Sequence, residues 1–387
     1  MIRIAFAAMA ALAMVGNAAA QEAKPLDRPV DQTLIKQLAE KVEPSLKGHQ
    51  DRVSQYVEMF RHNMANDPRL CVFAVEAKPQ GEKGVELTGF VEFPETRAAL
   101  EAYFTTLGFQ PVESNIETLP SKDLGEKRFG FIKSPHSLSY AKSNKTQVET
   151  DCLLGESLFL LQQIGNVYFV HAGDGYLGYV AAEDILPVDE ATFAEYLEGP
   201  RVSLRKDQQG AKGSPLLAGS RLKWLRTEGD RYVALTPTGE EVTVPTDESD
   251  LREMPTERLD VVCTNAKQLL GTKYLWGGKT SGGVDCSGLV QLSFGNAGVR
   301  IPRDANQQIH MGQLTGTRWS RAAMRRGDTL YFLNSQGKVS HTGLYLGDDQ
   351  FIHAVTPVVV INSFNPDDKN YDHTRHASFA FARRLWE

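Results

Sequence analysis

Hydrophobic residues recur at helical spacing near the start of the chain and in alternation further along. Between residues 21 and about 68 the apolar positions lie three to four residues apart, which indicates helix; they include Leu34, Leu38, Val42 and Leu46. The following pattern predicts strands over 71–76 and 85–91, and a helix over 95–107 that ends at Gly108. We therefore predict an N-terminal helical and α/β region over 21–126.

Short strands separated by turn residues dominate the middle of the chain. Residues 158–161, 167–170 and 179–181 are strand-like segments divided by Gly-Asn and Gly-Asp-Gly turns. The pattern recurs at 222–225, 231–235 and 241–244. Turns at such spacing indicate small all-β barrels. We predict one barrel over 127–190 and a second over 200–248.

A charged segment over 248–255 is expected to be a linker, and a new helical pattern follows it. The helix should begin near Thr256 and end at Gly271. Its apolar face has Leu259, Val262, Cys263, Ala266, Leu269 and Leu270. Because a buried thiol packs like a small hydrophobe, Cys263 is expected in the core.

The first twenty residues have the pattern of a secretory signal peptide. Arg3 precedes an apolar run to Val15, and Ala18-Ala-Ala20 provides small residues for cleavage. No later run is long and apolar enough to cross a bilayer, so we expect an exported, soluble chain without membrane insertion, periplasmic or secreted. The sequence does not distinguish these two locations.

Composition narrows the classes of partner. The 387 residues carry 48 acidic and 42 basic side chains, a net charge of −6. This balance does not favour a nucleic-acid-binding protein. Four cysteines in an oxidising compartment allow two disulfides in three connectivities, and Cys71–Cys152 is one candidate bridge.

Cys286 is the candidate nucleophile. It follows a glycine-rich loop and opens an apolar helical run, Leu289 to Phe294. At the first turn of a helix a cysteine meets unpaired N–H groups and the positive end of the dipole, which favour the thiolate. Such a nucleophile needs a base.

Two histidines on predicted strands are the candidate partners of this thiol. His341 lies in the strand 340–346 and His353 in the strand 351–355, after a Gly347-Asp348 turn. Their twelve-residue separation makes them neighbours across an antiparallel hairpin. Because both strands are otherwise apolar, each imidazole needs a polar partner. Neither histidine, with His310 or His373, has the short ligand spacing of a zinc site, and His373 and His376 are expected in a solvated loop.

The sequence resembles the NlpC-type peptidases, a papain-like family of bacterial wall-peptide hydrolases. The matching pieces stand in the family's order in the C-terminal third: Tyr274-Leu-Trp-Gly-Gly278, Asp285-Cys-Ser-Gly288, Pro302-Arg-Asp304 with Gln307-Gln308, Gly327-Asp328, Ser340-His-Thr-Gly343 and Phe351-Ile-His-Ala354. The resemblance implies an α+β fold with a papain-like catalytic domain over 256–387. It makes Cys286 the nucleophile, His341 the base and His353 the residue that orients it. The two predicted barrels resemble the SH3-like domains that accompany wall hydrolases.

The resemblance also implies a substrate. Relatives with this architecture are endopeptidases that cleave γ-D-glutamyl-L-diamino acid bonds in muropeptides. By that likeness Asp285, Ser287 and Asp304 bind the free amino end of an L-alanyl peptide, and the first barrel contributes Tyr176. Tyr274 is the expected second oxyanion donor, beside the backbone N–H of Cys286. Ala305 stands where the close relatives carry serine, which leaves fine specificity open.

The sequence leaves other interpretations standing. The chain could be a D,L-endopeptidase or amidase on intact wall, or a non-catalytic wall-binding protein. The intact set of Cys286, His341 and His353 argues against the last. Asp285 and Asp304 could merely cap helices, and Tyr274 could be a core aromatic. We expect a monomer that needs no metal or cofactor. The sequence does not say which diamino acid is accepted.

Overall fold

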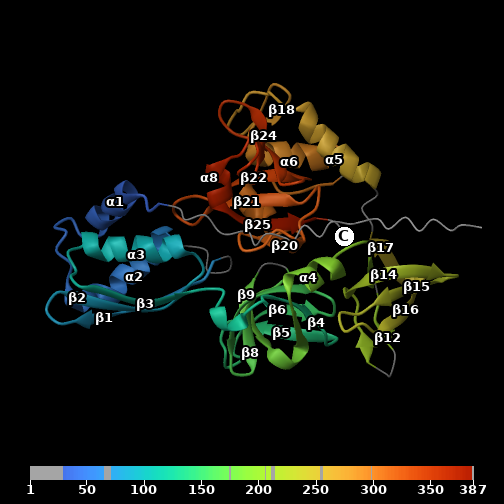
Figure 1. Ribbon diagram of the computed structural model, residues 1–387, viewed down its shortest axis with the longest axis horizontal. Helices are drawn as coiled ribbons and strands as arrows, with labels where there is room; N and C mark the ends of the chain where they lie inside the picture. Colours follow the sequence, from blue (N-terminus) through green and yellow to red (C-terminus); the bar gives the residue numbers. More distant parts are fainter. Residues whose placement is uncertain are drawn as a thin grey trace, which may run out of the picture.

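The protein is a mixed helix and strand chain, seen here in a computed structural model (Figure 1). The structure describes residues 29–64, 71–173, 176–204, 206–210, 214–252, 256–297 and 299–385. The predicted signal peptide, residues 1–20, lies outside them. Within these ranges the helices are too short or too polar to cross a bilayer.

The N-terminal elements form a three-stranded sheet covered by helices. They are α1 (Gln32–Val42), η1 (Gln50–Arg52), α2 (Val53–Met64), β1 (Phe73–Gln80), β2 (Gly84–Val91), α3 (Pro94–Thr106), β3 (Val112–Thr118) and η2 (Lys122–Leu124). β1 and β2 are antiparallel, while β2 and β3 run parallel because α3 crosses between them. Phe60, Leu87 and Phe104 lie in their common core. The predicted helices and strands of this region are confirmed, and β3 is an addition.

The next elements form a seven-stranded antiparallel sheet in the order β10-β4-β7-β8-β9-β5-β6. They are β4 (Phe129–Ile132), β5 (His136–Tyr140), β6 (Val148–Leu153), β7 (Ser157–Ile164), β8 (Val167–His171), β9 (Leu177–Ala181), η3 (Ala182–Asp184), β10 (Ile185–Val188) and α4 (Glu190–Tyr196). The three strands predicted here correspond to β7, β8 and β9.

A five-stranded antiparallel sheet follows, in the order β16-β15-β14-β11-β17. Its unit comprises β11 (Arg201–Leu204), β12 (Gln208–Gln209), β13 (Pro215–Leu216), β14 (Arg221–Glu228), β15 (Arg231–Leu235), β16 (Glu241–Pro245), η5 (Thr246–Glu248) and β17 (Ser249–Arg252). The prediction of a linker over 248–255 was wrong for Ser249–Arg252. These residues pair with β11 as an edge strand, and Leu251 packs on the core of the unit.

The C-terminal elements place helices against a six-stranded antiparallel sheet. The helices are α5 (Thr256–Gln268), α6 (Cys286–Gly295), α7 (Ala305–Gln308) and α8 (His373–Ser378). The strands are β20 (Gln313–Thr317), β21 (Thr329–Leu333), β22 (Val339–Gly347), β23 (Gln350–Ala354), β24 (Val359–Ser363) and β25 (Phe379–Arg384), in the order β20-β25-β21-β22-β23-β24. A short hairpin, β18 (Lys279–Thr280) with β19 (Gly283–Val284), precedes α6. α5 and α6 pack together over β22, as Figure 1 shows.

Two details of this unit differ from prediction. Cys263 is fully buried as expected, but Leu270 follows the end of α5 and is 45% exposed. His373 and His376 lie in helix α8 rather than in a loop; His373 is exposed, whereas His376 is partly buried. His376 is held between Arg321 and Tyr371, at 3.2 Å from each. Burial is the main reason that the pKa of His376 falls to about 4.

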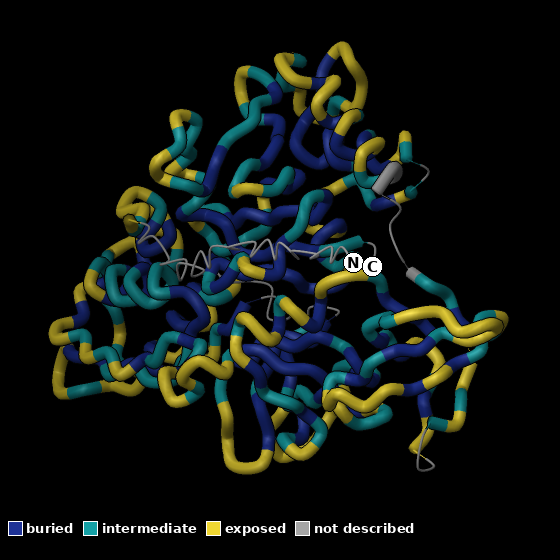
Figure 2. The backbone as a smooth tube through the Cα atoms, turned by 45° about the vertical axis from the view of Figure 1, so that its right-hand side comes forward, coloured by how far each residue is buried: buried dark blue, intermediate teal, exposed yellow. Residues whose placement is uncertain are grey.

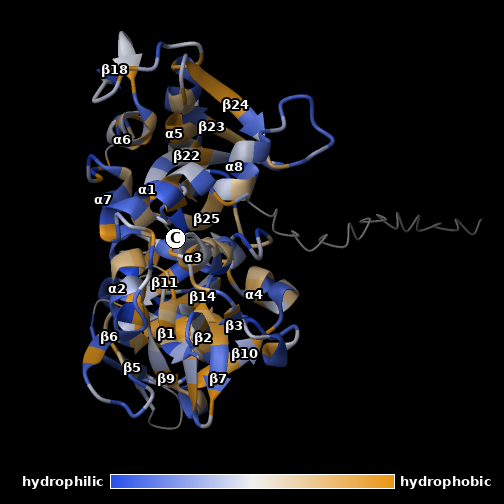
Figure 3. Ribbon diagram, turned by 90° about the vertical axis from the view of Figure 1, so that its left-hand side faces the viewer, coloured by the Kyte–Doolittle hydropathy of each residue, from blue (hydrophilic) through white to orange (hydrophobic). Residues whose placement is uncertain are grey.

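Buried polar contacts join the units. Glu92 and His171 are both almost fully buried, and their side chains meet at 2.9 Å between the N-terminal and seven-stranded units. The Arg318 guanidinium reaches both oxygens of Glu95, at 2.8 and 3.0 Å. Buried residues fill the interior of each unit (Figure 2), and hydrophobic residues are frequent in the strands (Figure 3). The C-terminal sheet therefore rests on a fixed support.

Candidate active site

Cys286 is the first residue of α6, and Asp285 caps that helix. The Asp285 carboxylate accepts from the Gly288 N–H at 2.7 Å, the usual N-cap interaction. A Cβ on Gly288 would collide with the Gly278 carbonyl oxygen, so only glycine lets the helix start this close to the preceding loop. The local sequence thus holds Cys286, which is 7% exposed, at a fixed helix start.

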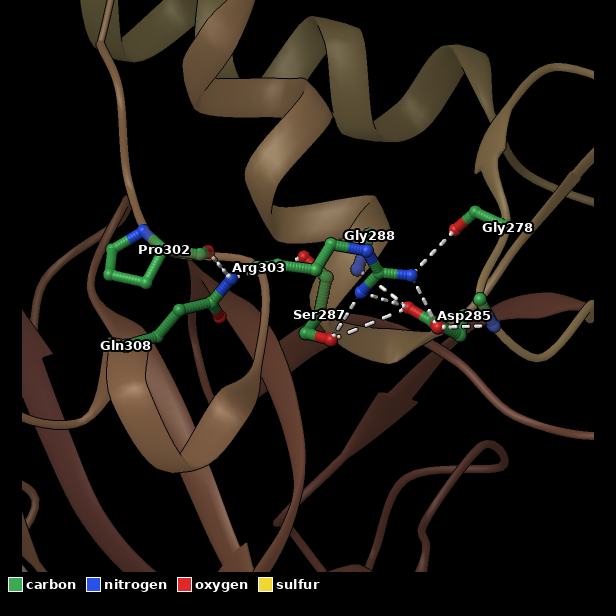
Figure 4. Close-up of polar contacts among 8 residues, drawn as sticks. Gly278, Asp285, Ser287, Gly288, Pro302, Arg303 and Gln308 are labelled. Atoms are coloured by element: carbon green, nitrogen blue, oxygen red, sulfur yellow. Dashed lines mark hydrogen bonds and ion pairs between the residues drawn. The ribbon is translucent and has the colours of Figure 1, made fainter.

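Arg303 completes the coordination of the Asp285 carboxylate. Its two terminal nitrogens donate to the two oxygens at 3.0 and 2.6 Å, and one also donates to the Ser287 hydroxyl at 2.8 Å (Figure 4). The Gly277 N–H donates to the same carboxylate at 2.7 Å. Burial opposes ionisation of Asp285, but Arg303 and the N–H donors of Gly288 and Gly277 outweigh it and lower its pKa.

His341, His353 and Asn362 form a hydrogen-bonded chain across β22, β23 and β24. His341 Nε2 and His353 Nδ1 are 2.8 Å apart, so the predicted juxtaposition across the hairpin is confirmed. His353 Nε2 lies 2.8 Å from Asn362 Oδ1, and Asn362 Nδ2 donates to the Asn370 carbonyl at 2.9 Å.

These hydrogen bonds determine which nitrogen of each imidazole carries the proton. The Asn362 oxygen can only accept, so His353 carries its proton on Nε2 and accepts on Nδ1. His341 must then donate from Nε2, which leaves its Nδ1 unprotonated. A neutral His341 held in this tautomer has the form that a general base requires.

β22 also lies near the nucleophile. Helix α6 packs on β22, and the backbone N–H groups of Thr342, Ser287 and Cys286 lie close enough to the thiol to act on its pKa. These donors lower the pKa of the thiol, but burial outweighs them and raises it, with the Asp285 charge acting in the same direction. Burial likewise holds the pKa of His341 well below 6.5, and that of His353 at about 4. Burial thus acts on both groups against the expected thiolate and favours the neutral thiol and the neutral imidazole.

Tyr274 shares the electrostatic environment of the nucleophile. Its N–H donates to the Pro357 carbonyl at 2.9 Å, and the residue bridges to Val284 just before the cap of α6. Burial raises the pKa of its hydroxyl, and negative charge on Cys286 and Asp285 raises it further. Its role as an oxyanion donor stays a prediction.

The predicted substrate-binding residues lie in different surroundings. Ser287 is buried and accepts from Arg303, whereas Asp304 is exposed at the start of α7 and gives α7 no side-chain cap. Tyr176 ends the loop between β8 and β9, whose Gly173 carbonyl accepts from Arg383 of β25 at 2.8 Å. Substrate binding by these residues and by Asp285 stays a prediction.

Three polar residues near the site were not predicted from the sequence. Arg303 lies in the Pro302-Arg-Asp304 segment, but no role could be assigned to it from the sequence. Asn362 lies on β24, the strand that pairs with the strand of His353. Arg375 lies on α8, and its guanidinium is 5.9 Å from the ring centroid of Phe332. A polar residue in an otherwise apolar strand was the signal available for Asn362, and its partner could not be named because it depends on strand register.

The candidate disulfide was wrong. All four cysteines lie in the described residues, and none is in a disulfide there. Cys71 packs beside the Gly337 turn of the C-terminal unit, whereas Cys152 lies in the core of the seven-stranded unit. In the described ranges, no group of three or more His, Cys, Asp or Glu side chains is placed to hold a metal ion.

Residues 271–376 match the model of the NlpC/P60 family, so the C-terminal part of the chain carries an NlpC/P60 domain. The chain is similar to the Gamma-D-glutamyl-L-lysine dipeptidyl-peptidase of Bacillus cereus, with 26% identity over 55% of this chain and 68% of that protein. It is also similar to the Murein DD-endopeptidase MepS/Murein LD-carboxypeptidase of Escherichia coli K12, with 39% identity over 27% of this chain and 55% of that protein.

Solved structures give a related result. The crystal structure of an NlpC/P60 family protein from Bacillus cereus aligns over 67% of this chain and 100% of that chain, with 22% identity and a TM-score of 0.30. Among the curated relatives named above, the chain spans about two thirds of the Bacillus cereus protein and about half of the Escherichia coli protein.

Proposed function

Starting from the NlpC/P60 domain, we propose that the protein is a cysteine endopeptidase acting on peptidoglycan-derived peptides with a free N-terminal L-alanine. The bond hydrolysed is the γ-D-glutamyl-L-diamino acid bond. The observation that carries the proposal is the hydrogen-bonded series His341–His353–Asn362, which leaves an unprotonated imidazole nitrogen on β22, the strand against which the helix of Cys286 packs. A non-catalytic wall-binding protein would have no use for this arrangement.

The mechanism begins from the neutral pair. The Cys286 proton moves to Nδ1 of His341 while the sulfur bonds to the amide carbon, so the thiolate need not exist at rest. The carbonyl electrons move to oxygen, where the Cys286 N–H and the Tyr274 hydroxyl donate hydrogen bonds. The C–N bond then breaks, and His341 protonates the leaving amine. Water attacks the thioester, gives a proton to His341, and the sulfur recovers it as the acyl group leaves.

The substrate class is supported by the name of the 26% identical relative, a γ-D-glutamyl-L-lysine dipeptidyl-peptidase. An ammonium group at the peptide's free end requires a carboxylate that is not already neutralised. Asp285 is paired with Arg303, whereas Asp304 is exposed at the start of α7. We therefore assign ammonium binding chiefly to Asp304, with Asp285 and Ser287 holding the wall of that subsite.

The accompanying β units belong to the same proposal. We infer that the seven- and five-stranded units are SH3-like domains, and that the first places Tyr176 at the edge of the substrate cleft. The proposal includes action outside the cytoplasm, periplasmic or secreted, by a monomer.

A second candidate is endopeptidase action on intact wall. The 39% identical relative is named a murein DD-endopeptidase and LD-carboxypeptidase. The residue after Asp304 is the buried Ala305, whereas the γ-D-glutamyl-L-diamino acid endopeptidases carry serine at this position. A subsite lacking that hydroxyl would discriminate less sharply between free and blocked peptides.

The test uses the mature protein and its Cys286→Ala variant. Each is incubated with L-Ala-γ-D-Glu-diaminopimelate, free and N-acetylated, and with purified sacculi, and products are followed by mass. Release of L-Ala-D-Glu from the free peptide alone, absent in the variant, supports the proposal. Release of fragments from sacculi only would favour the second candidate, and no cysteine-dependent product from any substrate would refute both.

A further inference from the structure

One cation beside the active site has no part in the mechanism above. Arg375 lies on α8, which packs beside β21. Its guanidinium carbon is 5.9 Å from the ring centroid of Phe332, on β21. The Phe332 ring in turn lies 5.5 Å from the His341 ring. Phe332 is thus a common neighbour of Arg375 and of the base.

Arg375 interacts electrostatically with the nucleophile as well. Burial lowers the pKa of Arg375, while negative charge on Asp372, Cys286 and Tyr274 raises it. The positive charge of Arg375 in turn contributes to the lowered pKa of His341 and His353. The guanidinium therefore lies within electrostatic reach of Cys286, Tyr274 and His341.

Arg375 differs from its neighbours in lacking an acidic partner. Arg303 is paired with Asp285, and Arg384 with Asp328. Across the ranges that the structure describes, no hydrogen bond or ion pair involves the Arg375 side chain. The Asp372 carboxylate accepts instead from the Arg375 backbone N–H, at 2.9 Å, as the cap of α8. A partly buried guanidinium without an anion is costly, and a carboxylate that binds it recovers that cost.

We propose that Arg375 binds a carboxylate of the substrate next to the scissile bond. The proposal rests on the proposed function, which supplies the group. A γ-linked D-glutamyl residue keeps its α-carboxylate free, and the carboxylate carbon is four carbon–carbon bonds from the carbonyl carbon that Cys286 attacks. The planar fork of a guanidinium matches such a carboxylate. Arg375 is therefore a specificity-determining residue that selects γ-linked glutamate over its amidated form.

The first test needs no peptide substrate. Iodoacetate and iodoacetamide both alkylate the Cys286 sulfur with loss of iodide, and they differ in a carboxylate against a neutral amide. The ratio of their rate constants cancels the reactivity of the thiol and reports the charge beside it. Rates are measured by mass on the peptide that contains Cys286. N-acetylcysteine amide gives the ratio for a thiol without a neighbouring cation.

We expect the native protein to exceed the small thiol in this ratio by about tenfold, the size of one charge-assisted hydrogen bond. Arg375→Gln should remove the excess, and Arg375→Lys should keep part of it. Arg226→Gln removes the same charge from the exposed surface of the five-stranded unit and should leave the ratio unchanged. A native ratio equal to that of the small thiol overturns the proposal, even if Arg375→Gln does not fold. Equal losses of both rates in Arg375→Gln also overturn it, because they indicate thiol activation.

The second test separates this proposal from the proposed function. L-Ala-γ-D-Glu-L-Lys is compared with the peptide that carries D-isoglutamine at the second position. The native enzyme should prefer the acid, and Arg375→Gln should lose about tenfold on the acid and little on the amide. Equal cleavage of both by the native enzyme would overturn the carboxylate assignment. If neither is cleaved, the proposed function fails, while the alkylation ratio still decides whether Arg375 binds a carboxylate.

Discussion

Arg303 and Asp285 are joined by two hydrogen bonds, 3.0 and 2.6 Å long, at the N-cap of the helix that begins with Cys286. The carboxylate also accepts from Gly277 and Gly288. It therefore fastens the glycine loop, the start of α6 and the segment before α7 to one another. The main role of Asp285 is thus to hold together the segments around Cys286.

Arg303→Gln is expected to lower the free energy of unfolding by roughly 2–3 kcal/mol, because it leaves the buried Asp285 carboxylate without its counter-charge. Urea unfolding measures the change. Arg226→Gln breaks ion pairs with Glu228 and Glu241 that are about half exposed, and should change the free energy of unfolding far less, because solvent screens these pairs. An equal decrease in the free energy of unfolding of the two variants would refute this stabilising role of the Arg303–Asp285 pair.

Asn362→Leu should reduce kcat by roughly tenfold or more with little change in KM, because His353 loses the acceptor that fixes its tautomer. Asn362→Asp keeps an acceptor and should retain more activity. Nitrogen-15 NMR of the imidazoles provides an independent readout, since the leucine variant should populate the other tautomer of His353. Unchanged tautomers in the leucine variant would show that Asn362 does not fix the tautomer of His353.

His353 makes stability depend on pH. The folded protein keeps His353 neutral down to about pH 4, whereas the unfolded chain binds a proton near 6.5. As the pH falls from 6.5 towards 4, protons favour the unfolded state, and below 4 the difference stays constant. Between pH 7 and pH 5 the native protein should lose about 2 kcal/mol more than His353→Gln does. Urea unfolding at both pH values checks this, and parallel losses would show that other groups are responsible.

Cys286 should be alkylated slowly at mildly acidic pH. Burial raises the pKa of the thiol, so the rate with iodoacetamide should still increase above pH 9 in the native protein. In urea the same cysteine should titrate near its ordinary value of about 8.5. A rate plateau between pH 5 and pH 7 would instead reveal a resting thiolate–imidazolium pair.

Asp304→Asn should raise KM for the free L-alanyl peptide by about tenfold, since it removes the charge assigned to the ammonium group. For the N-acetylated peptide, which has no ammonium group, Asp304→Asn should leave KM unchanged. Asp367→Asn, which changes another exposed acid, is the matched control. An equal effect of Asp304→Asn on both peptides would remove the ammonium assignment.

The sequence predicted those parts of the site that depend on local spacing. Cys286 at a helix start and the two histidines across one tight turn are set by neighbours in the chain, and the structure contains both. Arg303, Asn362 and Arg375 reach the site from separate segments, so their partners depend on how loops and strands pack. The thiolate was predicted from the helix terminus alone, and burial, which only the folded protein defines, reverses that expectation.

β25 lies between β20 and β21, although it follows both in the chain. A polypeptide that emerges N-terminus first presents those two strands well before the one that separates them. Residues 379–384 must arrive before β20 can join the sheet, while the nucleophile and its base are already present. A chain stalled before Phe379 therefore contains Cys286, His341 and His353 but lacks the strand that completes the sheet supporting them.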